Sequence, residues 1–175
     1  MKNIEFFIYL LIICFTFISC EKKNDTPTIK GTVDLYLIDT YETKSNSYQI
    51  IHSTVITKGT PLISYTDILG YSPSEHTFTL TNEAIQIIKN LEHSVYGLPF
   101  AIKAHDELIY TGYFWPGYSS AGCDWIVIDP IFVEMNNTMK VNLGYPGLLE
   151  GMTIPDDRND NRILDIFRRD GKLIE

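Results

Sequence analysis

Alternating apolar and polar positions predict β-strands in the part of the chain that follows residue 30. In the first of these segments Val33, Leu35 and Leu37 recur at a period of two, which is typical of a strand with one buried face. The second segment is dense in β-branched side chains, which favour extended backbone. The strands expected in this first half are residues 31–40, 50–57, 62–69 and 76–81.

Two segments have the period of an amphipathic helix instead. The first begins at a capping residue, Thr81 or Asn82, and runs to about His93. Its apolar side chains follow the helical spacing and are Ala84, Ile87, Ile88 and Leu91. The second helix is expected at residues 161–173, and its apolar side chains are Ile163, Ile166 and Phe167, with Ile174 as a further candidate.

The remaining apolar segments predict further strands. Residues 100–104 and 108–115 flank a short polar turn, which indicates a hairpin. Residues 125–133 form an almost continuous apolar run, typical of a central strand with Pro130 at its end or at a bulge. Residues 140–143 can pair beside it.

This order of elements predicts one α+β domain at residues 31–175, with a mostly antiparallel sheet, one central helix and one C-terminal helix. The whole chain of 175 residues has the length of a single domain. Its hydrophobic share of 45% and aromatic share of 13% are those of a protein with a packed core.

The N-terminal residues predict export followed by lipid anchoring. Residues 6–18 are apolar and uncharged, but at about 1.5 Å per residue a helix of this length falls short of the roughly 30 Å hydrocarbon core of a bilayer. Phe17-Ile18-Ser19-Cys20 resembles the lipoprotein signal, in which a small residue precedes a lipid-modified cysteine. The resemblance implies a signal peptide at residues 1–19, acyl chains on Cys20 that hold the protein to a membrane, and a lipidated tether at residues 20–30.

An ordinary secretory signal or an uncleaved anchor is the alternative for this N-terminus. Two features bear on which membrane would hold the lipid. An acidic residue at the position of Glu21 retains lipoproteins at the inner membrane of some bacteria. The chain also looks like a Bacteroidota-type lipoprotein family of uncharacterised activity, whose relatives mostly reach the outer membrane. We expect a cell-envelope location, at the outer rather than the inner membrane.

Charge and cysteine content narrow the possible functions. The net charge of −8 disfavours nucleic-acid binding, because the phosphate backbone is recognised by basic surfaces. Cys14 lies in the predicted signal and Cys20 is expected to carry lipid, so Cys123 is the one thiol of the mature chain. An internal disulfide is therefore not expected, and no pattern points to a cofactor.

Residues 76–109 are similar to the periplasmic head domain of the SecD translocation subunit. In that family a strand ending in F-x-L-T precedes a helix with an early alanine, and an apolar strand and a tight turn follow. The matching residues here are Phe78-Thr79-Leu80-Thr81, Ala84, Phe100-Ala101-Ile102, Asp106 and Ile109. The resemblance implies the order strand, helix, hairpin for the middle of the chain, and it implies no activity.

Two residues are candidate nucleophiles. Gly117-Tyr118-Ser119-Ser120-Ala121 differs at one residue from the nucleophile-elbow pattern. Ser119 occupies the position of the nucleophile in that pattern. Cys123 would be activated if a histidine lay beside it, and His105 is the nearest in sequence. For both residues we favour a structural role over catalysis.

Metal binding has little support in the sequence. The histidines do not occur at helical ligand spacing, and a pair of mature cysteines is lacking, so a transition-metal site is not expected. Asp157, Asn159 and Asn161 alternate like the ligands of a calcium loop, but Arg162 and Arg168 occupy the positions that need glycine and an acid. We expect a solvated loop that caps the C-terminal helix.

The densest unusual feature is a group of aromatic residues interleaved with glycines. It comprises Tyr110, Tyr113, Phe114, Trp115, Tyr118 and Trp125. Such a group can fill the core, or it can form a platform for a sugar face or for the apolar side chain of a partner. Tyr113, Trp115 and Tyr118 are nearest the turn at Pro116, so we expect these three to be exposed.

Two functions from different classes follow from these features. The first is a lipid-anchored, non-enzymatic binding module that presents residues 113–118 to an envelope protein or a glycan. The second is an envelope hydrolase or transferase that uses Cys123 or Ser119. The reactivity of the Cys123 thiol distinguishes them.

Overall fold

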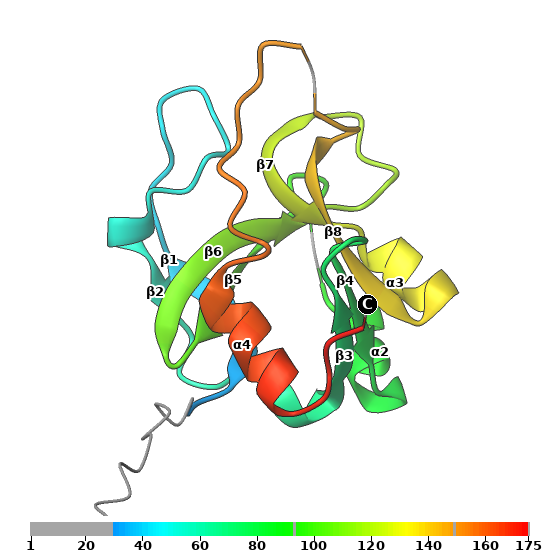
Figure 1. Cartoon of the computed structure of the whole chain (residues 1–175). Coiled ribbons are helices and arrows are strands. Elements are labelled where there is room, and N and C mark those ends of the chain that lie inside the picture. Colours follow the sequence, from blue (N-terminus) through cyan, green and yellow to red (C-terminus); the bar gives the residue numbers. More distant parts are fainter. Residues whose placement is uncertain (1–29, 93, 149, 175) are drawn as a thin grey trace, which may run out of the picture.

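The computed structural model describes residues 30–174 apart from residues 93 and 149 (Figure 1). Within this part of the chain eight strands form one sheet in the order β2-β1-β5-β6-β7-β8-β4-β3. Neighbouring strands are antiparallel except β6 and β7. The strands are β1 (Val33–Thr40), β2 (Ile56–Thr57), β3 (Ile68–Ser72), β4 (Thr77–Leu80), β5 (Leu98–Ala104), β6 (Glu107–Phe114), β7 (Cys123–Ile128) and β8 (Thr138–Tyr145). The predicted α+β class with a mostly antiparallel sheet is confirmed.

The predicted signal peptide and the lipidation site Cys20 lie outside the described residues. The helices of the described part are α2 (Asn82–Lys89), α3 (Pro130–Asn136) and α4 (Asn161–Arg169), with single 3-10 turns η1 (His52–Thr54) and η2 (Tyr65–Asp67). None of these helices is long and apolar enough to cross a membrane.

The sheet curves around α4. In Figure 1, β5 and β6 lie on one side of this helix, and β3 and β4 lie on the other. The ring of Phe167 packs against Tyr71 and Phe78, with ring centroids 5.5 and 6.0 Å away. Arg162 on the same helix donates to Glu107 at the start of β6. The C-terminal helix therefore fills the concave side of the sheet, and its buried residues belong to the main core.

Short chain segments cover the outer side of β3 and the part of β1 that the edge strand β2 does not reach. Beside β1, residues 62 and 63 donate to Leu35 O, and Leu35 N donates to Ile63 O. Beside β3, Tyr71 N donates to Lys172 O, and Ile174 N donates to Tyr71 O. These contacts occupy backbone groups that an open edge strand would offer to another chain.

The two predicted helices are present but shorter than expected. Thr81 caps α2 by accepting a hydrogen bond from Ala84 N, as predicted. The buried side chains of α2 are Ala84, Ile85 and Ile88, whereas Ile87 is exposed, so the predicted apolar stripe is wrong by one position. Helix α2 packs beside α3.

The C-terminal helix begins where Asp160 accepts from Arg162 N and ends at Arg169, before the predicted residue 173. The chain leaves the helix at Gly171, whose positive φ of 65° suits glycine. Ile163, Ile166 and Phe167 are buried as predicted. Ile174 is exposed, because it lies beyond the helix in the segment that pairs with β3.

Helix α3 was not predicted. The apolar run expected to be one strand at residues 125–133 is a strand only to Ile128. Asp129 then accepts a hydrogen bond from Ile131 N, and Pro130 occupies the first helical position. Aspartate followed by proline is a helix-start signal, so the strand prediction for residues 131–133 is wrong.

Two predicted strands are mostly irregular. In residues 50–57 the strand is limited to β2, because η1 interrupts the segment. In residues 62–69 the backbone of Ser64 donates to the carboxylate of Asp67 at the turn η2. Side chains of this kind offer the backbone a local alternative to sheet pairing. The predicted hairpin is confirmed as β5 and β6, with positive φ at His105 and Asp106 in the turn.

Candidate binding site

The structure corrects the expected exposure of the aromatic segment. Tyr113 and Trp115 are only 2% and 0% exposed, so the prediction that they are accessible is wrong. Their rings contact the ring of Tyr48, which belongs to a loop that folds back over β6. Tyr118 is exposed, at 62%. An accessible platform of the three side chains is therefore not formed.

Neither candidate nucleophile is activated. Ser119 Oγ donates to the backbone carbonyl of Val95 at 2.7 Å, so the hydroxyl stabilises a loop. Cys123 is 1% exposed, and burial raises the pKa of its thiol to about 12. The thiol form therefore predominates at neutral pH.

The segment that resembled a calcium loop is used to attach α4 to the sheet. Asn159 Oδ1 accepts from Tyr71 Oη at 2.8 Å, and Asn159 Nδ2 donates to Pro73 O at 3.1 Å. The side chain of Asp160 caps α4. Among the described residues no group of three or more His, Cys, Asp or Glu side chains could hold a metal ion.

A cavity of about 340 Å³ lies where β6 and β7 separate. The two strands pair at Tyr113 with Val127 and at Phe114 with Ile128, and they diverge before these residues. The lining residues of the cavity are Lys44, Ile50, Ile51, His52, Tyr110, Trp125, Ile126, Pro155 and Asp157. Its floor is buried and mainly apolar, and its rim is exposed and polar.

Side-chain contacts hold the loop of residues 44–52 over the place where β6 and β7 separate. Asp124 Oδ2 accepts from Ser47 Oγ at 2.6 Å, and Asp124 Oδ1 accepts from Tyr48 N at 2.7 Å. Gln49 Nε2 donates to Thr153 O at 3.2 Å, which ties the loop to the segment that forms the opposite wall. The cavity is thus a preformed feature of the fold, as small-molecule sites usually are.

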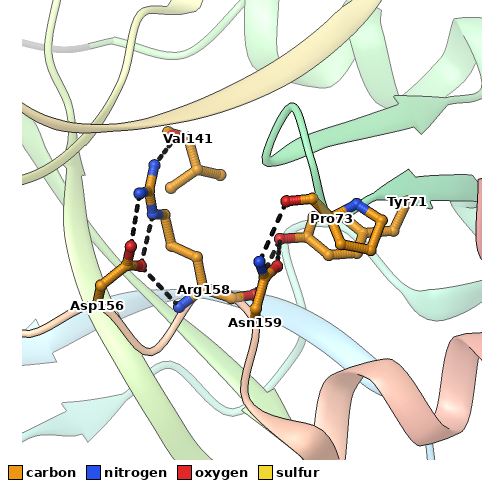
Figure 2. Close-up of polar contacts among 6 residues, drawn as sticks. All are labelled: Tyr71, Pro73, Val141, Asp156, Arg158 and Asn159. Atoms are coloured by element: carbon orange, nitrogen blue, oxygen red, sulfur yellow. Dashed lines mark hydrogen bonds and ion pairs between the residues drawn. The ribbon is translucent and has the colours of Figure 1, made fainter. Parts of the chain in front are cut away.

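The opposite wall is held by a buried arginine (Figure 2). Arg158 Nε and Nη2 donate to the two carboxylate oxygens of Asp156, and Arg158 Nη1 donates to Val141 O at 2.8 Å. Arg158 is only 8% exposed, so its charge is compensated by Asp156 within the fold. Figure 2 also shows the hydrogen bonds of Asn159 to Tyr71 and to Pro73. These contacts attach the segment at residues 156–159 to β3 and β8.

Tyr110 is the unusual residue of the cavity floor. Its side chain is 1% exposed, and its hydroxyl has no hydrogen-bond partner among the described residues. Burial raises the pKa of this phenol well above its ordinary value, with Tyr71, Arg158 and Asp156 as its electrostatic neighbours. The hydroxyl has no surface accessible from the cavity, so it lies beneath the floor rather than in the open space. A buried hydroxyl without a partner is rare in folded proteins.

The rim carries one acidic and one basic side chain together with a histidine. Lys44 Nζ donates to Gln49 Oε1 at 2.9 Å, so part of its hydrogen-bonding capacity is used within the loop. Burial lowers the pKa of His52, and the nearby carboxylate of Asp157 acts in the opposite direction. The imidazole is therefore neutral at pH 7, and it can donate and accept hydrogen bonds.

Two further hollows adjoin α3. They measure about 370 and 300 Å³, and Asp129, Phe132 and Asn142 line both of them. Neither contains a buried polar side chain that lacks a partner in the described part of the chain. Three hydrogen bonds hold the loop of residues 44–52 across the cavity at Tyr110, so that cavity is the stronger candidate.

Comparison of the chain with protein-family models found no match, and comparisons with curated proteins and with solved structures found none either. The order β4, α2, β5, β6 is the one implied by the resemblance to the SecD head domain. The resemblance itself stays a prediction.

Sequence reasoning identified Tyr110 as part of the aromatic group, but not as part of a site. His52, Trp125 and Asp157 are brought together from three distant segments. The local signal that could have pointed to this region is Asp124, an acidic residue within the apolar strand β7. Its role in binding the loop at residues 47–48 depends on the tertiary fold.

Proposed function

We propose that this chain is a lipid-anchored, non-enzymatic binding module of the cell envelope, and that the cavity at Tyr110 receives a small polar part of an envelope protein or glycan. The observation that carries the proposal is the cavity itself, which has an apolar floor and a rim with Lys44, His52 and Asp157, and whose walls are held together by hydrogen bonds. Specific ligand sites combine an apolar lining with a few polar groups of this kind.

Binding is better supported than catalysis. Cys123 is buried with a raised pKa, and Ser119 donates to a backbone carbonyl. The alternative function, an envelope hydrolase or transferase that uses Cys123 or Ser119, has no supporting contact in the described part of the chain. No cofactor is needed for the proposed binding.

The proposed anchor is the lipid on Cys20. The sequence Phe17-Ile18-Ser19-Cys20 and the polar residues that follow it support this assignment. We favour the outer membrane over the inner one on the overall resemblance to Bacteroidota lipoproteins. An anchored module binds a partner of the same envelope at a high effective concentration, so moderate affinity is sufficient.

The binding proposal is tested with the lipoprotein in detergent and a panel of neutral sugars, charged sugars, amino acids and short peptides. We expect at least one compound to raise the melting temperature in a saturable way, because a ligand specific for the native state stabilises it. The variant Ile51→Trp places a bulky ring in the cavity lining and should abolish the effect. Ile56→Trp, on an exposed position of β2, is the matched control and should retain it.

Absence of any saturable shift across the panel would overturn the proposed role of the cavity. The same conclusion follows if Ile51→Trp and the wild type bind equally well. The anchor is tested separately by palmitate labelling of the wild type and of Cys20→Ala. Label that remains in the variant refutes lipidation at Cys20.

A further inference from the structure

We infer that two neighbouring loops, at residues 94–97 and 117–122, form a docking surface for a second envelope protein, whose own contact surface is apolar and uncharged. This docking surface is separate from the cavity at Tyr110, so the inference goes beyond the proposed function. It is argued from the contacts between the loops, the exposure of their side chains, their lack of charge, and their position in the domain.

Hydrogen bonds join the two loops to each other. Ser119 Oγ donates to Val95 O at 2.7 Å, so Tyr118 and Tyr96, which are next to these residues in the chain, lie on loops in direct contact. The first loop is a tight turn, in which Tyr96 N donates to Ser94 Oγ at 3.1 Å. The shape of the docking surface is therefore set before a partner binds.

The first loop also lies directly on the core. Gly97 has a positive φ of 80°, and a Cβ atom there would be 2.8 Å from the ring of Trp115. Trp115 is 0% exposed, so this support is rigid. A loop that is held in place in this way loses little conformational entropy when a partner binds.

The side chains at the tips of the loops are accessible. Val95 is 47% exposed, Tyr96 is 60% exposed and Tyr118 is 62% exposed. Tyrosine offers a large apolar ring and a hydroxyl at a low entropic cost, and with serine and glycine it dominates the contact loops of antibodies. Residues 117–122 have this composition, with the sequence Gly-Tyr-Ser-Ser-Ala-Gly.

The loops carry no charge. Residues 94–102 and 108–123 contain no Asp, Glu, Lys, Arg or His, although charged residues make up 21% of the whole chain. After the second loop, the carboxylates of Asp124 and Asp129 accept hydrogen bonds from within the fold. An apolar, uncharged surface can therefore be buried against these loops without leaving an ion unpaired.

The hydrogen bonds of the loops favour a protein over a glycan as the partner. Ser94 Oγ donates to Gly97 O, and Ser119 Oγ donates to Val95 O, so both hydroxyls already act within the loops. A glycan presents many hydroxyls, and each of them needs a donor or an acceptor when it is buried. An apolar protein surface has no such need, and aromatic side chains are the usual anchors of protein interfaces.

The docking surface lies at the far end of the domain from the start of the described chain. Gly31 lies against His105 in the turn between β5 and β6, because a Cβ atom on Gly31 would be 2.5 Å from His105 Nδ1. The two loops adjoin the opposite ends of these strands, across the seven residues of β5, or about 20 Å. In Figure 1 the described chain starts at the lower left, and the segment between β6 and β7 lies near the top. The proposed lipid on Cys20 would therefore hold the docking surface away from the membrane, toward a protein partner.

The inference is tested by site-specific photo-crosslinking in native membranes. The photoreactive residue p-benzoylphenylalanine replaces Tyr96 or Tyr118, and in the control it replaces Leu69, an exposed residue on the edge strand β3. Mass spectrometry identifies the crosslinked products. We expect the same protein to be crosslinked from the two tyrosine positions and not from the control position.

The identified protein is then purified and titrated by calorimetry with the lipoprotein in detergent. Tyr96→Ala and Tyr118→Ala should each weaken binding about tenfold, because aromatic anchors dominate such interfaces. Leu69→Ala, at a side chain that is 54% exposed, is the matched control and should bind like the wild type. The dissociation constant should change less than about threefold between about 0.05 and 0.5 M salt, since uncharged contacts are not screened.

The other possible results would overturn the inference. These are crosslinking of no protein, equal crosslinking from all three positions, crosslinking of a glycan instead of a protein, and a dissociation constant that rises steeply with salt. Binding that is lost in Ile51→Trp but kept in both tyrosine variants would place the partner at the cavity. That result would support the proposed function and overturn the inference. Binding that is lost in the tyrosine variants and kept in Ile51→Trp supports the inference, whether or not the cavity binds a ligand.

Discussion

Arg158 and Asp156 form a bidentate ion pair, in which Nε and Nη2 of the guanidinium each donate to a different carboxylate oxygen at 2.7 Å. The arginine side chain is 9% exposed, and the aspartate side chain is 42% exposed. The pair therefore presents a buried cation to a carboxylate that still contacts solvent. Because residues 155 and 157 line the cavity, this ion pair also determines the position of one cavity wall.

Asp156→Asn should lower the free energy of unfolding at pH 7 by about 1–3 kcal/mol, because it leaves Arg158 buried without its counter-ion. The exposure of Asp156 keeps the effect below that of a fully buried pair. Urea denaturation gives the value. Asp165→Asn breaks the exposed pair with Arg168 and should change stability by less than about 0.5 kcal/mol. Equal effects of the two variants would contradict the structural role of Arg158.

Stability should fall in acid, and Asp156 should contribute to this fall. Hydrogen bonds from Arg158 lower the pKa of Asp156 in the folded protein. The unfolded chain therefore binds the proton first, near the ordinary aspartate pKa of about 3.9, and the stabilisation is lost as the pH falls through the lower folded value. Asp160 and Asp170 have lowered pKa values as well, so Asp156→Asn should flatten the profile only in part. Urea denaturation between pH 6 and 3 measures how steeply the free energy of unfolding falls with pH. An unchanged slope in the variant would contradict the contribution of Asp156.

The regular elements of this fold were predictable because their signals are local. The hairpin of β5 and β6 follows from two apolar runs around a polar turn, and the start of α2 follows from the capping Thr81. Boundaries were less predictable, since Gly171 and the Asp129-Pro130 start signal compete with the apolar pattern. Capping and turn residues determine where these helices and strands end as much as the hydrophobic period does.

The candidate site was not predictable, because non-local contacts create it. Tyr113 and Trp115 come just before the turn at Pro116 and Gly117 and look accessible in the sequence, but the loop that carries Tyr48 covers them. The cavity joins Ile51, Tyr110 and Pro155, which come from three distant parts of the chain. A single sequence holds no periodic signal for such a contact.

Trp115→Ala and Tyr118→Ala should have very different effects on stability. Trp115 is 0% exposed and its ring packs against Tyr48, so its truncation should cost about 3–5 kcal/mol. Tyr118 is 62% exposed, and its truncation should cost less than about 0.5 kcal/mol. Thermal unfolding of both variants tests the burial. Similar melting temperatures would show that the aromatic segment is not arranged as described.

The Cys123 thiol should react slowly in the native protein. A pKa of about 12 leaves a thiolate fraction at neutral pH that is about a thousandfold smaller than at an ordinary thiol. Iodoacetamide labelling at pH 7.5, followed by peptide mapping, gives the rate at this cysteine. We expect labelling to become rapid only in urea. Fast labelling of the native protein would revive the hydrolase or transferase alternative.

Gly112 lies where β6 approaches β7, at the end of the cavity where the two strands come together. A Cβ atom there would be 2.6 Å from Ile126 O and 2.5 Å from the ring of Phe100, and both distances are too short for a carbon contact. Gly112→Ala must therefore push the strands apart or displace the ring, which should cost about 1–3 kcal/mol. Gly59→Ala, at a glycine with no atom within 4 Å of its Cβ position, is the matched control and should change stability little.

The position of Gly112 links stability to binding. If Ile126 moves with the backbone, the cavity that it lines changes shape, so Gly112→Ala should weaken ligand binding in addition to lowering the melting temperature. Comparison at equal fractions of folded protein separates the two effects. A variant that loses stability but binds the ligand unchanged would show that the ring of Phe100 moves instead, and that the cavity does not depend on the close approach of β6 and β7.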